Sequence, residues 1–299
     1  MPGPVGTVVI VNPHSGSARE ELRTRIAAAL PDATMIVLGK SDDLKAATRS
    51  AIARGAGCIV AAGGDGTVSA VAAELIGTAT RLGIIPSGTA NSIAATLGIP
   101  EDVDQACAIV AAGHVRVIDT ARAGDRPLLL TASIGLHAQA VTSASPEVKA
   151  MLGPLAYVSK GMELLLGAEP FDVELTVDGE KRTTLTASVH ALTVANMAPP
   201  RTFLAQGPPE VAPDDGLLDV TLVAFDGVLD AVATSLHLYR NALEGLPSNR
   251  DGVVFLRGTR VAVKATPVQQ LMIDGELVGE TPFEVELRPE TLAVMAPAK

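Results

Sequence analysis

The stretch GCIVAAGGDGTVSAVAAEL, residues 57–75, joins a short apolar run to a glycine-rich turn and then to a helical pattern. The apolar residues predict a buried strand, and the small-residue pattern from Thr67 onward predicts a helix that begins at the glycines. Anions are favoured at such a helix N-terminus by unpaired N–H donors and by the helix dipole. The turn is therefore a candidate phosphate site.

Asp65 places a carboxylate inside this turn, where it would repel a phosphate group. One interpretation is that Asp65 reaches a magnesium ion, directly or through water, because Mg²⁺ keeps several waters and few protein carboxylates. The other interpretation is that Asp65 caps the N-terminus of the helix that follows. The turn by itself does not separate the two.

Two further strand-like runs end in loops of the same chemistry. The first ends at Asn12 in VNPHSGSA, residues 11–18, and the second ends before Ser87 in IIPSGTANSIA, residues 84–94. In an open parallel sheet, ligands bind beyond the carboxyl ends of the strands, so these loops are expected to converge on one crevice. Ordinary turns and caps would explain each loop separately but not their coincidence.

The pattern of the whole chain predicts two domains. Residues 1–118 alternate strand-like and helix-like runs, which is typical of a parallel sheet with crossover helices. Residues 119–289 carry mostly period-two runs, which predict an antiparallel β-sandwich, with helices expected over 146–167 and 226–244. The last residues, 290–299, are expected to join the first domain.

Composition narrows the class of protein. With 299 residues and 47% hydrophobic content, the chain can bury a large core. A net charge of −10, 2% aromatic residues and no Trp argue against a nucleic-acid-binding surface. Cys58 and Cys107 are expected to be buried and reduced, and no segment has the pattern of a signal peptide or spanning helix. The expected location is the cytoplasm.

Five motifs occur in a fixed order: NPHSG at 12–16, GGDGT at 63–67, PSGTAN at 86–91, DDGLLDV at 214–220 and IDGE at 273–276. In this order they resemble the bacterial diacylglycerol kinase catalytic-domain family, relatives of sphingosine and ceramide kinases. GGDGT also occurs in NAD kinases and, nearly unchanged, in phosphofructokinases, but the last two motifs favour lipid kinases. The resemblance implies an ATP-binding α/β domain like that of NAD kinases and phosphofructokinases, a β-sandwich acceptor domain, and an active site between them that transfers the γ-phosphate of ATP to a lipid hydroxyl.

The resemblance also implies roles for particular residues. It links Asp65 to Mg²⁺, and it places a structural Mg²⁺ on the carboxylate of Asp215 and on backbone carbonyls at Ala212 and Leu217. Asp274 and Glu276 supply the general base, and the sequence does not say which. From the residues alone, the Asp-Gly pairs of both motifs could equally be hairpin turns. The implied nucleotide-binding residues are Asn12, Gly63, Gly64, Asp65, Gly66, Thr67, Gly88, Thr89 and Asn91.

The chain departs from the family pattern at two places. Ser92 stands where the family usually has an acidic residue, and MAPPRTFLAQGPPEVA, residues 197–212, has four prolines where paired glycines are usual. The shape of the acceptor site is therefore expected to differ. The expected partners are a lipid substrate and, transiently, the inner face of the membrane, with a homodimer left open. The alternatives are an NAD kinase-like enzyme and a non-catalytic regulator that binds nucleotide or lipid.

Overall fold

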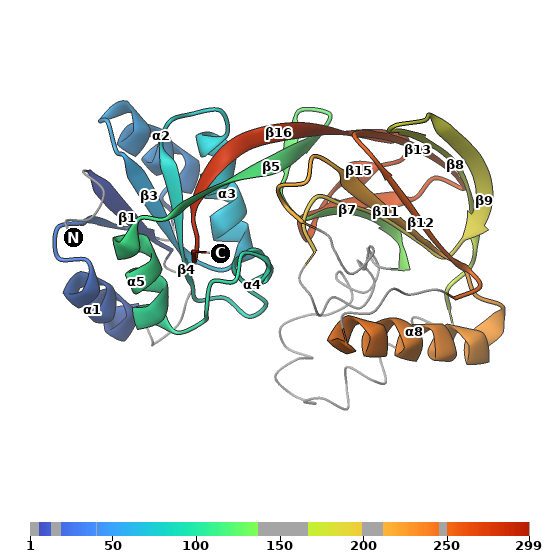
Figure 1. Ribbon diagram of the computed structural model, residues 1–299, viewed down its shortest axis with the longest axis horizontal. Helices are drawn as coiled ribbons and strands as arrows, with labels where there is room; N and C mark the ends of the chain where they lie inside the picture. Colours follow the sequence, from blue (N-terminus) through green and yellow to red (C-terminus); the bar gives the residue numbers. More distant parts are fainter. Residues whose placement is uncertain are drawn as a thin grey trace. The chain divides into compact units, whose positions relative to one another are not determined.

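The chain forms two compact units in the computed structural model, which describes residues 6–12, 19–39, 41–136, 167–198, 212–244 and 250–298 (Figure 1). One unit comprises residues 1–120 together with 288–299, and the other comprises residues 121–287. The helix expected over 146–167 lies outside the described residues, apart from its last position. The described part of the chain contains no helix that is both long and apolar enough to cross a membrane.

The first unit contains a parallel sheet in the order β2-β1-β3-β4, which confirms the alternation predicted from the sequence. Helix α1 packs beside α5, and α2 packs beside α3 (Figure 1). Central strand β3 is buried along its whole length, which is why its sequence shows no polar alternation. The bounds of these elements are β1 Thr7–Val11, α1 Arg19–Ala29, β2 Thr34–Val37, α2 Leu44–Ala53, β3 Cys58–Gly63, α3 Asp65–Leu75, β4 Arg81–Pro86, α4 Ser92–Thr96 and α5 Val103–Ala112.

Local capping explains where several helices begin and end. The side chain of Asp43 accepts a hydrogen bond from the Ala46 amide at the start of α2. Asp102 does the same at the start of α5, which ends at Gly113 in the left-handed conformation, with φ 73°. Both free cysteines, Cys58 and Cys107, are buried as predicted, and burial raises the pKa of their thiols to about 12 and about 11.

Strand β16 (Phe283–Met295) belongs to both units. Its first half pairs with β13 (Arg260–Thr266) in an antiparallel ladder, and its end pairs with β4 in parallel, with Val294 opposite Leu82. Strand β5 (Val115–Ala123) also pairs with β16. The parallel sheet of the first unit is thus extended by β16.

The second unit is a mainly antiparallel β-sandwich, as predicted. One sheet has six strands in the order β12-β11-β10-β7-β14-β15, and the strands β13, β8 and β9 pair in the other sheet beside β16. Alternate residues of the two sheets, such as Leu192, Val220 and Val263, are buried in one core. The remaining bounds are β6 Arg126–Leu128, β7 Thr131–Gly135, β8 Phe171–Asp178, β9 Thr183–Val189, β10 Ala191–Ala195, β11 Leu218–Val223, α8 Gly227–Glu244, β12 Val253–Gly258, β14 Gln270–Ile273 and β15 Glu276–Glu280.

Two continuous runs in the sequence are each divided between the two sheets. The run at 253–265 divides after Gly258, where a Cβ atom would lie 2.5 Å from a side-chain carbon of Val177 and 2.6 Å from the carbonyl oxygen of Asp178. The run at 186–196 divides at His190, whose ring stacks on Phe225 with a centroid distance of 3.7 Å. Burial lowers the pKa of His190, and its Nδ1 accepts a hydrogen bond from the Phe225 amide.

Candidate active site

Two glycine loops touch at the carboxyl ends of neighbouring parallel strands. Gly63, at the end of β3, pairs with Pro86, at the end of β4, and its carbonyl accepts a hydrogen bond from the Ser87 amide at 3.0 Å. A Cβ atom on Gly88 would lie only 2.5 Å from the Cα of Gly64. The contact is therefore made by backbone alone, and side chains are excluded from this part of the crevice.

Asp65 binds the second loop rather than capping its own helix. Helix α3 has Gly64 at its N-cap position, with no side-chain cap. The Asp65 carboxylate instead accepts hydrogen bonds from the amides of Ser92, at 3.0 Å, and Ile93, at 2.9 Å, at the start of α4. Asp65 therefore accepts hydrogen bonds from amides at a helix N-terminus, as the capping interpretation predicted, but the helix is α4 and not α3. Each carboxylate oxygen retains a lone pair, so the geometry also fits contact with a metal-bound water.

Asn91 and Asn12 hold the loops in shape. Asn91 adopts the left-handed conformation with φ 50°, and its side chain bonds to both the amide and the carbonyl of Gly88, at 2.9 and 3.1 Å. Asn12 Nδ2 donates to Thr67 Oγ1 at 2.7 Å, which joins the end of β1 to the first turn of α3. These predicted nucleotide-binding residues thus shape the backbone around the candidate phosphate site. The loop residues 13–18 lie outside the described residues.

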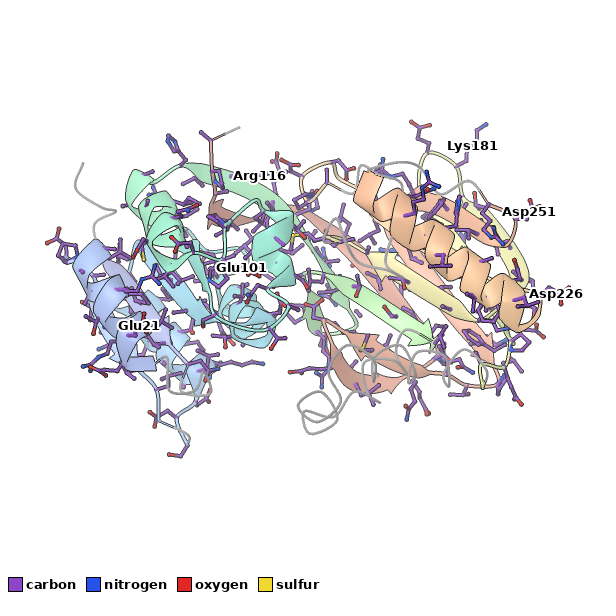
Figure 2. The ribbon with its side chains drawn as sticks, turned by 90° about the horizontal axis from the view of Figure 1, so that it is seen from below. Glu21, Glu101, Arg116, Lys181, Asp226 and Asp251 are labelled. Atoms are coloured by element: carbon purple, nitrogen blue, oxygen red, sulfur yellow. The ribbon has the colours of Figure 1, made fainter. Side chains whose placement is uncertain are left out.

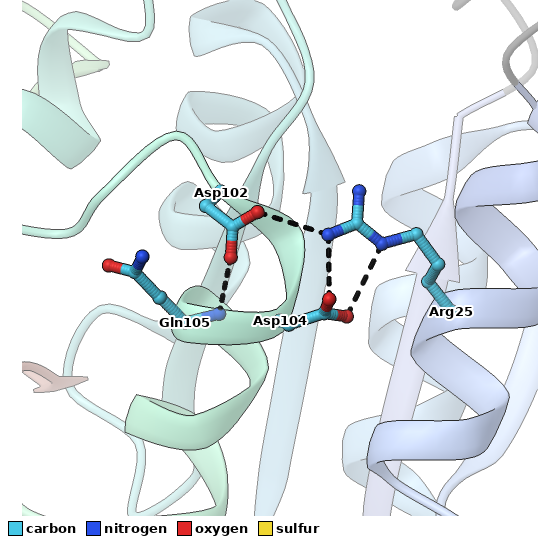
Figure 3. Close-up of polar contacts among 4 residues, drawn as sticks. All are labelled: Arg25, Asp102, Asp104 and Gln105. Carbon is cyan, nitrogen blue, oxygen red and sulfur yellow. Dashed lines mark hydrogen bonds and ion pairs between the residues drawn. The ribbon is translucent and has the colours of Figure 1, made fainter.

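A cavity of about 340 Å³ adjoins the second glycine loop, on the side of α1 and α5. Its lining includes Glu21 of α1 and Glu101 just before α5, both labelled in Figure 2. The Arg25 side chain also lines it, but its guanidinium bonds to Asp102 at 3.0 Å and to Asp104 at 2.8 Å (Figure 3). The Gln105 amide and this guanidinium lower the pKa of Asp102. Because Asp102 and Asp104 balance the charge of Arg25, the carboxylates of Glu21 and Glu101 leave the cavity negatively charged. Phosphate is therefore unfavourable in the cavity and fits best at the glycine loops.

The structure separates the two carboxylates of IDGE. Asp274 has a left-handed backbone, with φ 48°, and its carboxylate accepts hydrogen bonds from the amides of Leu129, Leu130 and Thr131 at 2.9, 2.8 and 3.1 Å. Glu276, two residues later, is exposed at the start of β15. Asp274 thus holds the backbone before β7, whereas the Glu276 side chain is exposed. The sequence shows no trace of this difference, because the partners of Asp274 are main-chain amides.

The predicted metal ligand Asp215 contacts an arginine that the sequence did not single out. One oxygen of Asp215 accepts a hydrogen bond from the Leu217 amide at 3.0 Å, and the other pairs with Arg257. Arg257 Nε also donates to Asp219 at 2.8 Å, and burial raises the pKa of Asp219 to about 6. In the described residues, no three His, Cys, Asp or Glu side chains gather in a way that could hold a metal ion. A guanidinium already neutralises the Asp215 carboxylate and would repel a Mg²⁺ ion placed beside it, so this arrangement does not fit a Mg²⁺ site.

Comparisons with known families agree with this geometry. A family model described as the diacylglycerol kinase catalytic domain matches residues 6–123. A second, described as the YegS C-terminal NAD kinase beta sandwich-like domain, matches residues 131–296. The chain therefore belongs to the diacylglycerol kinase family of lipid kinases, as its motifs predicted.

Individual relatives support the same assignment. The diacylglycerol kinase of Bacillus subtilis is 30% identical over 286 residues, which cover 92% of this chain and 91% of that protein. An uncharacterized protein of Synechocystis is 40% identical over 256 residues, which cover 86% of this chain but 58% of that protein. The crystal structure of a diacylglycerol kinase from Bacillus anthracis superposes with a TM-score of 0.76 at 25% identity, over 97% of this chain and 96% of that one.

Proposed function

We propose that this protein is an ATP-dependent lipid kinase that transfers the γ-phosphate to a hydroxyl of a diacylglycerol-like or related lipid. The observation that carries the proposal is the backbone contact between Gly64 and Gly88 beside the N-terminus of α3. The first turn of α3 would offer its main-chain N–H groups to a phosphate, and the glycine contact keeps side chains from blocking the approach. Family membership supports a lipid as the acceptor.

The nucleotide site of this proposal lies entirely in the first unit. A Mg²⁺ ion bound with ATP would neutralise phosphate charge, and Asp65 would hold a water of that ion through its remaining lone pairs. The two loops and the first turn of α3 would position the phosphates. The residues proposed to form the site are Asn12, Gly63, Gly64, Asp65, Gly66, Thr67, Gly88, Thr89 and Asn91.

Glu276 is the proposed general base. Its carboxylate takes the proton of the lipid hydroxyl while that oxygen forms a bond to the γ-phosphorus and the bond to the β,γ-bridging oxygen breaks, releasing ADP. No covalent intermediate on the protein is required. Exposure of Glu276 and the engagement of Asp274 with three amides support this choice between the two carboxylates.

The test is turnover of γ-labelled ATP by the purified protein in the presence of single acceptors. Diacylglycerol, monoacylglycerol, a sphingoid base, phosphatidylglycerol, a polyprenol and NAD form the panel. Label transferred to one of the lipids supports the proposal and names the acceptor. Label transferred to NAD alone makes the protein an NAD kinase-like enzyme, which the similarity of its second unit to an NAD kinase domain keeps as the alternative.

A matched pair of variants identifies the base. Glu276→Gln should lower kcat by at least about a hundredfold with little change in ATP affinity. Glu180→Gln changes the corresponding glutamate of the VDGE turn, residues 177–180, where Glu180 is exposed, and should leave kcat unchanged. ATP binding without turnover on any acceptor would favour the non-catalytic regulator. Membrane contact stays a prediction, and the oligomeric state stays open.

A further inference from the structure

The turn before β11 is held by a guanidinium. Asp215 lies in this turn and Asp219 lies inside β11, while Arg257 comes from the neighbouring strand β12, directly opposite Asp219 in the ladder. Arg257 pairs with Asp215 through one terminal nitrogen and donates from Nε to Asp219 at 2.8 Å. The guanidinium therefore joins the carboxylate of the turn to the carboxylate of strand β11.

The burial of Asp219 makes its ion pair with Arg257 important for stability. The side chain of Asp219 is 1% exposed, and its Oδ2 atom has no hydrogen-bond partner among the described residues. A buried carboxylate needs a compensating positive charge, and removing that charge is strongly destabilising. Arg257 is the cation that the structure supplies.

A magnesium ion at Asp215 would compete with Arg257. One Asp215 oxygen accepts the Leu217 amide and the other faces Arg257, so a Mg²⁺ ion on this carboxylate would have to displace the guanidinium or share an oxygen with it. A divalent cation a few ångströms from a guanidinium would also be repelled by it. We propose that Arg257 supplies the positive charge that the family resemblance assigns to a structural magnesium ion, so that this turn is held without metal. This inference does not depend on the proposed kinase activity.

The first measurement is the metal content of the purified full chain, before any chelator is added. The second is its Tm without nucleotide, after EDTA treatment and again with added MgCl₂. The wild type should contain no stoichiometric metal, and its Tm should be the same in both conditions. Arg257→Gln leaves two carboxylates without their cation and should lower Tm by roughly 5–10 °C. Added Mg²⁺ should restore part of that loss, because the two carboxylates can then bind it. Arg260→Gln is the control, since Arg260 is half exposed and pairs with surface glutamates, and its Tm should barely change.

A wild-type Tm that rises with Mg²⁺, with the rise lost in Asp215→Asn, would overturn the proposal. A rise that persists in Asp215→Asn places the metal elsewhere and agrees with it. If Arg257→Gln fails to fold, Arg257→Lys provides the second measurement, because lysine keeps the charge but cannot bridge both carboxylates with a fixed fork. Its Tm should lie below that of the wild type and should not respond to Mg²⁺, and a Tm equal to the wild type would count against the bridge.

Discussion

Replacing Asp274 should lower the free energy of unfolding of the second unit, with only a small loss of kcat per folded molecule. The Asp274 carboxylate accepts three main-chain hydrogen bonds, from Leu129, Leu130 and Thr131. A hydrogen bond to a charged group contributes about 1.5–3 kcal/mol, and such bonds on one group are not additive. Asp274→Ala should therefore lower the free energy of unfolding by about 3–5 kcal/mol, including the cost of alanine in the left-handed conformation at φ 48°.

Asp274→Asn separates charge from backbone shape, because asparagine tolerates the same left-handed conformation. Its single oxygen can still accept from Leu130 and Thr131, but its NH₂ group would face the Leu129 amide, so about 1.5–3 kcal/mol should be lost. Urea unfolding followed by circular dichroism measures both values. The transition assigned to the second unit is the one to compare, because a two-unit chain need not unfold in one step.

The comparison with Glu276→Gln makes the result decisive. That variant should unfold at the wild-type urea concentration while its kcat falls by at least about a hundredfold. Asp274→Asn should show the reverse pattern, with lower stability and a smaller loss of activity per folded molecule. If Asp274→Asn is as stable as the wild type and loses activity a hundredfold, Asp274 is the base and the positioning argument is wrong.

Three further outcomes are expected. Asp65→Asn keeps one of the two acceptors for the α4 amides and should lose about 1–2 kcal/mol of stability in denaturant unfolding, together with most of its turnover; unchanged turnover would assign Asp65 to structure alone. Because burial depresses the pKa of His190 below its unfolded value of 6.5, protonation favours the unfolded state. The contribution of His190 to stability should fall as the pH drops below about 6.5, in the opposite direction to that of Asp219, whose raised pKa favours the folded state on acidification. The Tm of the wild type should therefore fall more, or rise less, across this range than the Tm of His190→Gln, and parallel curves would contradict the assignment. Vesicle co-sedimentation should be weak and should not rise steeply with anionic lipid, since the net charge is −10, and a strong salt-sensitive rise would reveal a basic patch.

The sequence predicted the features that depend on side-chain pattern. Strand and helix periodicity gave the parallel sheet of the first unit and the sandwich of the second, and the glycines of GGDGT marked the loop that meets Gly88. It did not predict which carboxylates are engaged. Asp65 and Asp274 bind main-chain amides far along the chain, and any residue at those positions offers the same amide. No residue type could have signalled these contacts.

Side-chain partners left a weaker trace. Arg257 is the one charged residue of the strand VVFLRG, and a cation at such a position can pair with an acidic residue on a neighbouring strand. The sequence does not identify Asp219 as that partner, because strand pairing decides it. The division of the chain at Gly258 was equally hidden, since the period-two pattern continues unchanged on both sides of the glycine.

The placement of β16 has a consequence for the order in which the protein is assembled. Its final residues, Leu292, Val294 and Met295, are buried in the first unit, next to β4. During synthesis the N-terminal part of a chain usually folds first, but here the sheet of the first unit is completed only after β16 has left the ribosome. Until then the edge of β4 is an unpaired strand open to other nascent chains. A chain that ends shortly before residue 292 would therefore contain all of residues 121–287, attached to a first unit whose β4 edge is exposed. Such an exposed edge favours aggregation.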